Sequence, residues 1–171
     1  MSPSIIALGL DPGLATTGYG IIVREGRTVR VLAGGVLTTS KEMLRSERLK
    51  TLHDEVRELV EKYHPVGVAI EEVFFANNSK TAMMTAETRG ALLTAVCGLP
   101  IRGYTPLQVK KRIAGYGRAN KAQVQAMVQQ QLQLRELPRP DDMADGLALA
   151  LCYLRDDALL QGGVRNNACQ L

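Results

Sequence analysis

Four carboxylates stand out in this chain because of where they fall relative to apolar segments. They are Asp11, Glu71, Asp142 and Asp145. The first two end short apolar runs at residues 5–10 and 66–70, and the last two lie three residues apart at the start of an alanine- and leucine-rich segment. A carboxylate at the end of a buried strand is costly unless it is neutralised. A divalent cation neutralises several clustered carboxylates at once, so the four acids predict a metal-dependent enzyme.

The first two acids each have a plainer explanation. Asp11-Pro12-Gly13 is ordinary turn chemistry. Glu71 is followed by Glu72, and adjacent side chains of a strand point to opposite faces of the sheet. Only one of the two glutamates can therefore join Asp11, and the spacing does not say which.

The last two acids leave a similar choice. Asp142 and Asp145 share one side of a predicted helix, away from its apolar stripe, and so do Asp141 and Asp145. Acids in a first helical turn also favour the helix dipole without any metal. Each acid has a structural explanation alone, and the combination of three elements favours a metal site.

Positive charge is unevenly distributed along the chain. The net charge is only +4, yet the segment from Thr88 to Arg135 contains no Asp or Glu. Its basic residues include Arg89, Arg102, Lys110, Lys111, Arg112, Arg118, Lys121 and Arg135. Such a surface attracts polyanions, most often nucleic acid, although a solvated face without acids is the plainer alternative.

Length and composition limit the class of protein. A chain of 171 residues is expected to form one domain that buries roughly 70% of its unfolded surface. No segment approaches the roughly 18 apolar residues of a membrane span, and residues 1–4 do not resemble a signal peptide. The cysteines, Cys97, Cys152 and Cys169, lack CxxC spacing, which is typical of reduced thiols in a cytosolic protein.

Hydrophobic periodicity predicts an α/β fold. Strands are expected at about 4–10, 17–24, 28–37, 66–70 and 99–104, with a tight hairpin at Glu25-Gly26-Arg27. Helices are expected at about 43–63, 79–97, 106–114, 120–134 and 141–156. The result is a mixed sheet with helices on both faces, formed by a domain at 1–156 and followed by a flexible tail at 157–171.

The sequence resembles the RuvC-type Holliday junction resolvases of bacteria over nearly its whole length. The matching segments are Leu8-Gly9-Leu10-Asp11-Pro12-Gly13, Thr17-Gly18-Tyr19-Gly20, Ala69-Ile70-Glu71-Glu72-Val73-Phe74, Ala86-Glu87-Thr88-Arg89-Gly90, Gln108-Val109-Lys110, Lys121-Ala122-Gln123-Val124-Gln125 and Asp142-Met143-Ala144-Asp145-Gly146-Leu147-Ala148. The first segment alone is weak, because actin-like phosphotransferases begin similarly. All of them in this order are highly specific.

The resemblance implies a ribonuclease H-like fold with a five-stranded mixed sheet, and it resolves both ambiguities. The family's catalytic acids fall on Asp11, Glu71, Asp142 and Asp145. Some members carry histidine where this chain has Asp142. These acids are expected to bind two Mg²⁺ ions, which Mn²⁺ can replace. They are expected to cut two strands of a four-way DNA junction in a paired reaction, leaving 5′-phosphate and 3′-hydroxyl ends in recombination and repair.

The DNA-binding residues are expected to be Phe74, Arg89, Lys110, Lys111, Arg118 and Lys121. The resemblance places Lys110 and Lys121 on the family's DNA-contacting lysines, and phosphate contact is the expected role of the basic residues. Phe74 has two interpretations: stacking on an unpaired base, or packing as a hydrophobic staple before a helix.

A homodimer is expected because a four-way junction has a two-fold axis and one chain carries one acidic site. The predicted interface is the helix at 79–97, through its small and apolar residues Ala82, Met83, Ala86, Ala91, Leu92 and Ala95. Alternatively, this helix only covers the sheet. The resemblance further implies a cytoplasmic protein that works with the RuvA–RuvB branch-migration complex.

Two other functions fit the sequence less well. An actin-like phosphotransferase needs two subdomains around a nucleotide cleft, for which 171 residues are too few. A junction-binding protein without catalysis would be favoured by the loss of an acid, and all four acids are present. The sequence therefore favours a nuclease.

Overall fold

The computed structural model describes residues 4–73 and 79–162, and its centre is a five-stranded sheet. The strands are β1 (Ile5–Asp11), β2 (Thr16–Glu25), β3 (Thr28–Thr38), β4 (Gly67–Glu71) and β5 (Ile101–Tyr104). Their order is β3-β2-β1-β4-β5. The first three strands pair antiparallel, whereas β4 pairs parallel with both β1 and β5. The sheet is therefore mixed, as the sequence predicted.

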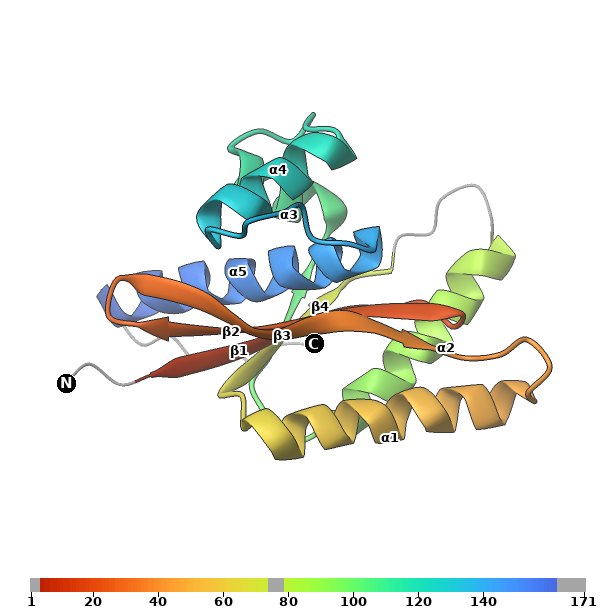
Figure 1. Ribbon diagram of the computed structural model, residues 1–171. Helices are drawn as coiled ribbons and strands as arrows, with labels where there is room; N and C mark the ends of the chain where they lie inside the picture. The colour runs from red at the N-terminus through yellow and green to blue at the C-terminus, as the bar shows by residue number, and fades with distance from the viewer. Residues whose placement is uncertain (1–3, 74–78, 163–171) are drawn as a thin grey trace.

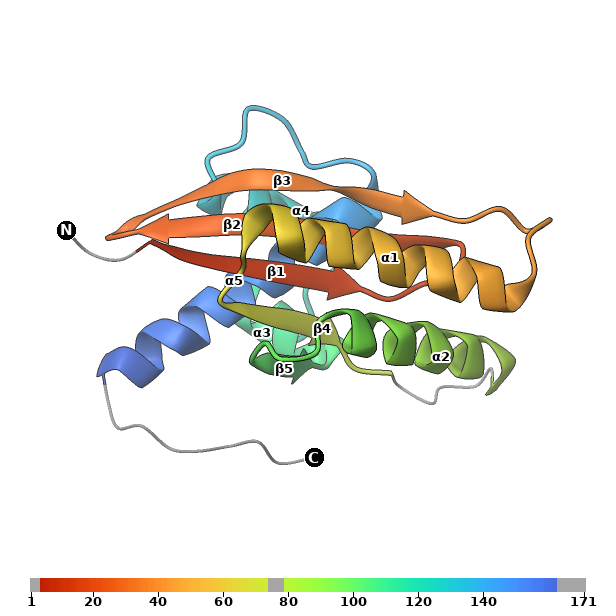
Figure 2. The same ribbon diagram turned by 90° about the horizontal axis from the view of Figure 1, so that it is seen from below.

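Helices cover both faces of this sheet (Figures 1 and 2). They are α1 (Arg45–Tyr63), α2 (Ser79–Ala95), α3 (Pro106–Ala114), α4 (Lys121–Gln131) and α5 (Asp141–Gly162). α1 and α2 cover one face. α5 lies directly on the other face, and α3 and α4 stand beyond it. No helix in the described ranges, 4–73 and 79–162, is long and apolar enough to cross a membrane.

The alternation of side chains along the central strands builds two separate cores. Leu8 and Leu10 of β1 pack in the core beneath α1 and α2, whereas Ala7 packs in the core beneath α5. Likewise Val68 of β4 faces α1 and α2, and Ala69 faces α5. Because side chains alternate with period two, odd-numbered positions at the ends of both strands point towards α5.

Glycines let α5 approach the sheet at backbone distance. A Cβ atom placed on Gly9 would lie 2.0 Å from the carbonyl oxygen of Gly146, and one placed on Gly18 would lie 1.9 Å from that of Asp142. Real Cβ atoms do not tolerate such distances, so these strand positions admit no side chain beneath α5. The contact extends to Gly20, where an added Cβ atom would lie 2.6 Å from the Cα atom of Leu147. The acidic end of α5 is consequently held directly against β1 and β2.

The predicted elements are confirmed, and only the ends of α4 and α5 differ from the prediction by more than two residues. α4 ends at Gln131, before the predicted end at 134, and Gln133 takes a positive φ of 52° that ends helical geometry. α5 continues to Gly162, beyond the predicted end at 156. The hairpin between β2 and β3 turns at Gly26, with φ of 61°. The boundary between a domain at 1–156 and a tail stays a prediction.

The close approach of α5 makes Gly9 sensitive to substitution. Gly9→Ala should lower the free energy of unfolding by about 3 kcal/mol, because the added methyl group meets helix backbone that cannot move locally. Gly34→Ala is the matched control in the same sheet. The nearest atoms to its methyl group would belong to the flexible Met143 side chain, which can rotate away. Urea denaturation of both variants measures the difference, and equal losses would contradict the role given to α5.

Candidate active site

The register of the sheet brings Asp11 and Glu71 together. Leu10 pairs with Ile70 across the parallel strands β1 and β4, so the next residues, Asp11 and Glu71, lie side by side at the strand ends. Both occupy odd-numbered positions, which point towards α5. Glu72 points the other way, and its carboxylate lies over Gly103 of β5. The choice that spacing left open between Glu71 and Glu72 is thus settled by strand alternation.

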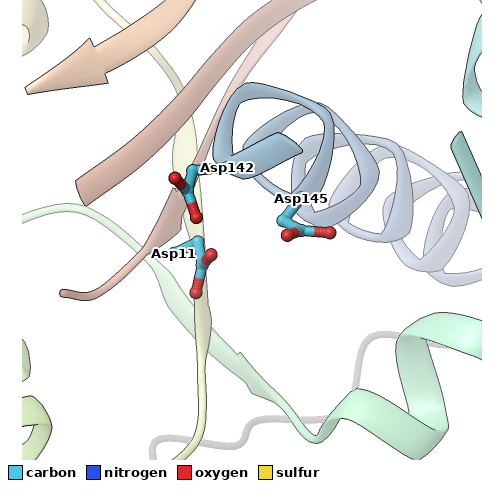
Figure 3. Close-up of side chains that lie close together, drawn as sticks. All are labelled: Asp11, Asp142 and Asp145. Carbon is cyan, nitrogen blue, oxygen red and sulfur yellow. The ribbon is translucent and has the colours of Figure 1, made fainter. Parts of the chain in front are cut away.

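α5 supplies two more carboxylates from its first turns. Asp142 and Asp145 face Asp11 at the end of β1 (Figure 3), and one oxygen from each of the three acids lies within 4.8 Å of the others. Asp141 instead faces α4, where its Oδ1 accepts a 2.8 Å hydrogen bond from Gln125 Nε2. Of the two candidate pairs on α5, the structure brings Asp142 and Asp145 to Asp11.

Burial and mutual repulsion raise the proton affinity of this cluster. Loss of hydration raises the pKa of Glu71 well above its usual range, and the adjacent charge of Asp11 raises it further. Burial, and then the charge of Asp145, raises the pKa of Asp11. Hydrogen bonding between the two side chains lowers the pKa of Asp11 and raises the pKa of Glu71, so Glu71 holds its proton more tightly than Asp11 does. The site therefore lacks enough positive charge for its acids.

Lys121 supplies part of that charge. Its Nζ atom lies 3.2 Å from Asp145 Oδ2 and 3.5 Å from Asp141 Oδ2. Asn120 caps α4 by accepting the backbone N–H of Gln123, which begins the helix next to α5 and fixes the origin of the Lys121 side chain. The sequence predicts Lys121 as a DNA contact and gives no sign of its ion pairs with the acids. No local spacing signals a contact between residues so far apart in the chain.

A cavity of about 210 Å³ opens beside the acids. Its lining residues are Glu71, Pro106, Val109, Lys110, Lys121, Val124, Asp145 and Leu149. Lys110 reaches this cavity from α3, so two of the predicted DNA-binding lysines share a space with two of the acids. Lys111 and Arg118 are exposed outside it.

Arg89, another predicted DNA-binding residue, does not line this cavity. Arg89 of α2 donates a 3.1 Å hydrogen bond from Nε to the backbone carbonyl oxygen of Glu71. It also lines a second cavity, of about 350 Å³, with Glu72, Val73 and Ala86. Arg89 therefore supports the strand end that carries Glu71. Phe74 lies outside the described residues, and its two interpretations stay open.

The donor set fits a hard divalent cation. All the clustered groups are carboxylates, and oxygen ligands of this kind suit Mg²⁺ or Mn²⁺ rather than zinc. Asp11, Asp142 and Asp145 are each half-buried, so they combine a protected position with access from solvent. Removing the repulsion that raises the pKa of Asp11 and Glu71 requires added positive charge, which a metal ion provides.

A five-stranded mixed sheet, acids at the ends of its two central strands and further acids on the crossing helix define a ribonuclease H-like fold with a candidate nuclease site. The sequence matches the family described as crossover junction endodeoxyribonuclease RuvC over residues 7–153. The chain therefore belongs to the RuvC family.

Relatives match over most of their length. The crossover junction endodeoxyribonuclease RuvC of Syntrophomonas wolfei is 48% identical over 149 residues, which is 86% of this chain and 87% of that protein. The structure of Thermus thermophilus RuvC superimposes with a TM-score of 0.84 at 36% identity, covering 91% of this chain and 96% of that one. A structure of T. thermophilus RuvC in complex with Holliday junction substrate gives a TM-score of 0.86 with the same identity and coverage.

The raised pKa values of the acids predict how stability depends on pH. Between about pH 4 and neutrality the folded chain binds more protons than the unfolded chain, so without metal its free energy of unfolding falls as pH rises. Glu71→Gln removes one of these groups and keeps a hydrogen-bond donor towards Asp11. At pH 8 without metal, this variant should melt about 2–4 °C higher than the wild type, which corresponds to ~1 kcal/mol.

Thermal melts at several pH values measure this effect, and Glu72→Gln is the matched control because Glu72 is exposed on the other face. The advantage of Glu71→Gln should shrink towards pH 4. An advantage that is independent of pH would mean that repulsion among the acids is not its cause.

Proposed function

We propose that this protein resolves four-way DNA junctions by divalent-metal-dependent hydrolysis of two opposed strands, leaving 5′-phosphate and 3′-hydroxyl ends in recombination and repair. The observation that carries this proposal is the meeting of Asp11, Asp142 and Asp145 beside Glu71, in a chain of the RuvC family. The junction as substrate is inferred from the relatives named for crossover junctions and from the T. thermophilus complex.

In this proposal, Asp11, Glu71, Asp142 and Asp145 would together hold two metal ions. When bound, Mg²⁺ ions supply an acidified water as nucleophile and stabilise the charge of the leaving oxygen. The rigid contact of α5 with the sheet keeps the carboxylates in register, which orients the attacked phosphate for in-line displacement. Mn²⁺, with the same preference for oxygen ligands, can replace Mg²⁺.

Lys121 and Lys110 hold the phosphate in this proposal. Both line the same cavity as Glu71 and Asp145, so a strand that enters it lies beside cations as well as acids. Cations beside the acids offset the repulsion between phosphates and carboxylates. The ammonium group of Lys121, which pairs with Asp145, would contact a phosphate oxygen if a metal ion neutralised that carboxylate.

We infer that two chains act together across a two-fold axis and that α2 forms the contact. Ala82, Leu92 and Ala95, three of the six residues predicted for this interface from the sequence, are buried within the chain and are not available. A stripe at helical spacing remains, in which Met83, Gly90 and Thr94 are exposed and Glu87 is half-buried. Met83 is 60% exposed, and a Cβ atom added to Gly90 would meet no atom of the described residues within 4 Å, which allows a second helix to approach closely.

The family membership also supports a cytoplasmic location and cooperation with the RuvA–RuvB branch-migration complex, because the proposed substrate arises where DNA recombines. Co-purification of the chain with these two proteins on junction DNA tests that partnership.

Each acid-to-amide substitution should abolish most cleavage and preserve junction binding. Asp11→Asn, Glu71→Gln, Asp142→Asn and Asp145→Asn should each reduce the cleavage rate by about 100-fold or more, because each removes one metal ligand. The assay uses a labelled four-way junction with and without Mg²⁺, and the wild type should give two opposed nicks only with metal. Glu72→Gln is the control and should stay within a few-fold of the wild type. An inactive Glu72→Gln beside an active Glu71→Gln would refute the proposed ligand set.

Loss of a cavity lysine should weaken binding in a salt-dependent way. Lys110→Ala should reduce junction affinity about equally for all sequences, and should lower the slope of log K against log salt by roughly one unit. Lys121→Ala should do the same. Lys62→Ala, at the far end of α1, is the matched control. Slopes that match the wild type in both cavity variants would mean that neither lysine contacts a DNA phosphate.

Met83→Asp should dissociate the proposed dimer without unfolding the chain, because the side chain is exposed. At a self-complementary contact the substitution places two carboxylates against each other. Apolar contact area is then lost and the two charges repel. Sedimentation at micromolar concentration should show twice 18.6 kDa for the wild type and 18.6 kDa for the variant. A wild-type chain that sediments as a monomer and still gives paired nicks would rule out this arrangement.

A further inference from the structure

Two cations of α3 and the following loop, Lys111 and Arg118, differ from those of α1 and from Arg112 of α3, which pairs with Asp156. On α1, Lys50 pairs with Asp54 and Arg57 pairs with Glu61. Lys111 and Arg118, by contrast, make no ion pair with any other residue in 4–73 or 79–162. The segment has no acid that could pair with them, since none occurs between Thr88 and Arg135. These charges are available to a polyanion.

The loop after α3 returns along the side of that helix. Gly115 ends α3 with a positive φ of 86°, and its N–H donates to the carbonyl oxygen of Lys111. Gly117 then lies against α3, where a Cβ atom would be 2.4 Å from Leu107 Cδ1 and 3.4 Å from Lys111 Cε. Tyr116 and Arg118 flank this contact. The four side chains of Leu107, Lys111, Tyr116 and Arg118 therefore form one surface, which we call the α3-loop surface.

Two large apolar side chains are exposed on the α3-loop surface. Leu107 is 53% exposed and Tyr116 is 48% exposed. Within the described part of the chain, neither belongs to the two cores of the molecule. Each shares this surface with Lys111 and Arg118, which have no acidic partner among the described residues. An ordinary solvated face does not need exposed apolar side chains beside such cations.

The α3-loop surface continues into the cavity beside the acids. Pro106 and Lys110, four residues apart, line that cavity, and Leu107 and Lys111 follow them on the adjacent side of the same helix. A strand held by Lys110 and Lys121 would therefore extend across Leu107 and Tyr116. Figure 1 shows α3 and α4 beyond α5, on the side away from the sheet.

We propose that the α3-loop surface binds the sugar–phosphate backbone of a duplex DNA arm, with Lys111 and Arg118 on phosphates and with Leu107 and Tyr116 against the apolar faces of deoxyribose rings. The inference rests on the proposed function and extends it to a site that contributes affinity beyond phosphate charge. Sugar contact requires no unpaired base, so it applies to any duplex arm. Tyr116 acts here through its ring and not through its hydroxyl group.

The test compares binding of a four-way junction and of a linear duplex by the full chain without divalent cation. Tyr116→Ala should weaken binding of both DNAs about five-fold, because an apolar contact is lost, and should leave the salt slope unchanged. Lys111→Ala should lower the slope by roughly one unit. Tyr116→Phe should bind as the wild type does. Val66→Ala, exposed at the opposite end of β4, is the apolar control.

Each other outcome overturns the proposal. Wild-type affinity in Tyr116→Ala would mean that Tyr116 makes no apolar contact with the DNA. Weaker binding of the junction alone would assign Tyr116 to stacking on an unpaired base, and a reduced salt slope would assign it to charge. The proposed function fails separately: if the wild type binds and Tyr116→Ala matches it, only the α3-loop surface is rejected, whereas a wild type that binds neither DNA rejects both.

Discussion

The backbone contact between α5 and the first two strands is the constraint on which the site depends. Asp142 and Asp145 start from α5, and Asp11 starts from β1, so the distance between helix and strand sets the distance between carboxylates. Gly9 and Gly18 make that distance as short as backbone atoms allow. Side chains between the two layers would separate the acids and leave them unable to share one cation.

Repulsion inside the cluster is the cost of this closeness. The raised pKa values of Asp11, Glu71 and Asp145 mean that the chain without metal holds protons that the ions would displace. Lys121 offsets part of the charge through Asp145, and Gln125 engages Asp141 on the opposite side. The site is thus stable enough to fold, while its remaining negative charge still favours binding of a cation.

Much of this could be predicted from the sequence because it depends on local periodicity. Apolar runs placed the five strands, and the acids that end two of those runs were expected to meet. Whether Glu71 or Glu72 faces α5 depends on which core each strand face covers, which spacing alone does not specify. The ion pairs of Lys121 and the burial of Leu92 and Ala95 depend on contacts between distant segments, which periodicity cannot reveal.

The sheet separates two cores that share no side chains among the described residues, one beneath α1 and α2 and the other beneath α5. Substitutions in the first core can alter the outer face of α2 while the carboxylates keep their positions, since the close backbone contacts of α5 lie on the other side. The two halves of the molecule can therefore diverge independently. In the proposed dimer, such changes would alter how two copies associate without rebuilding the carboxylate site.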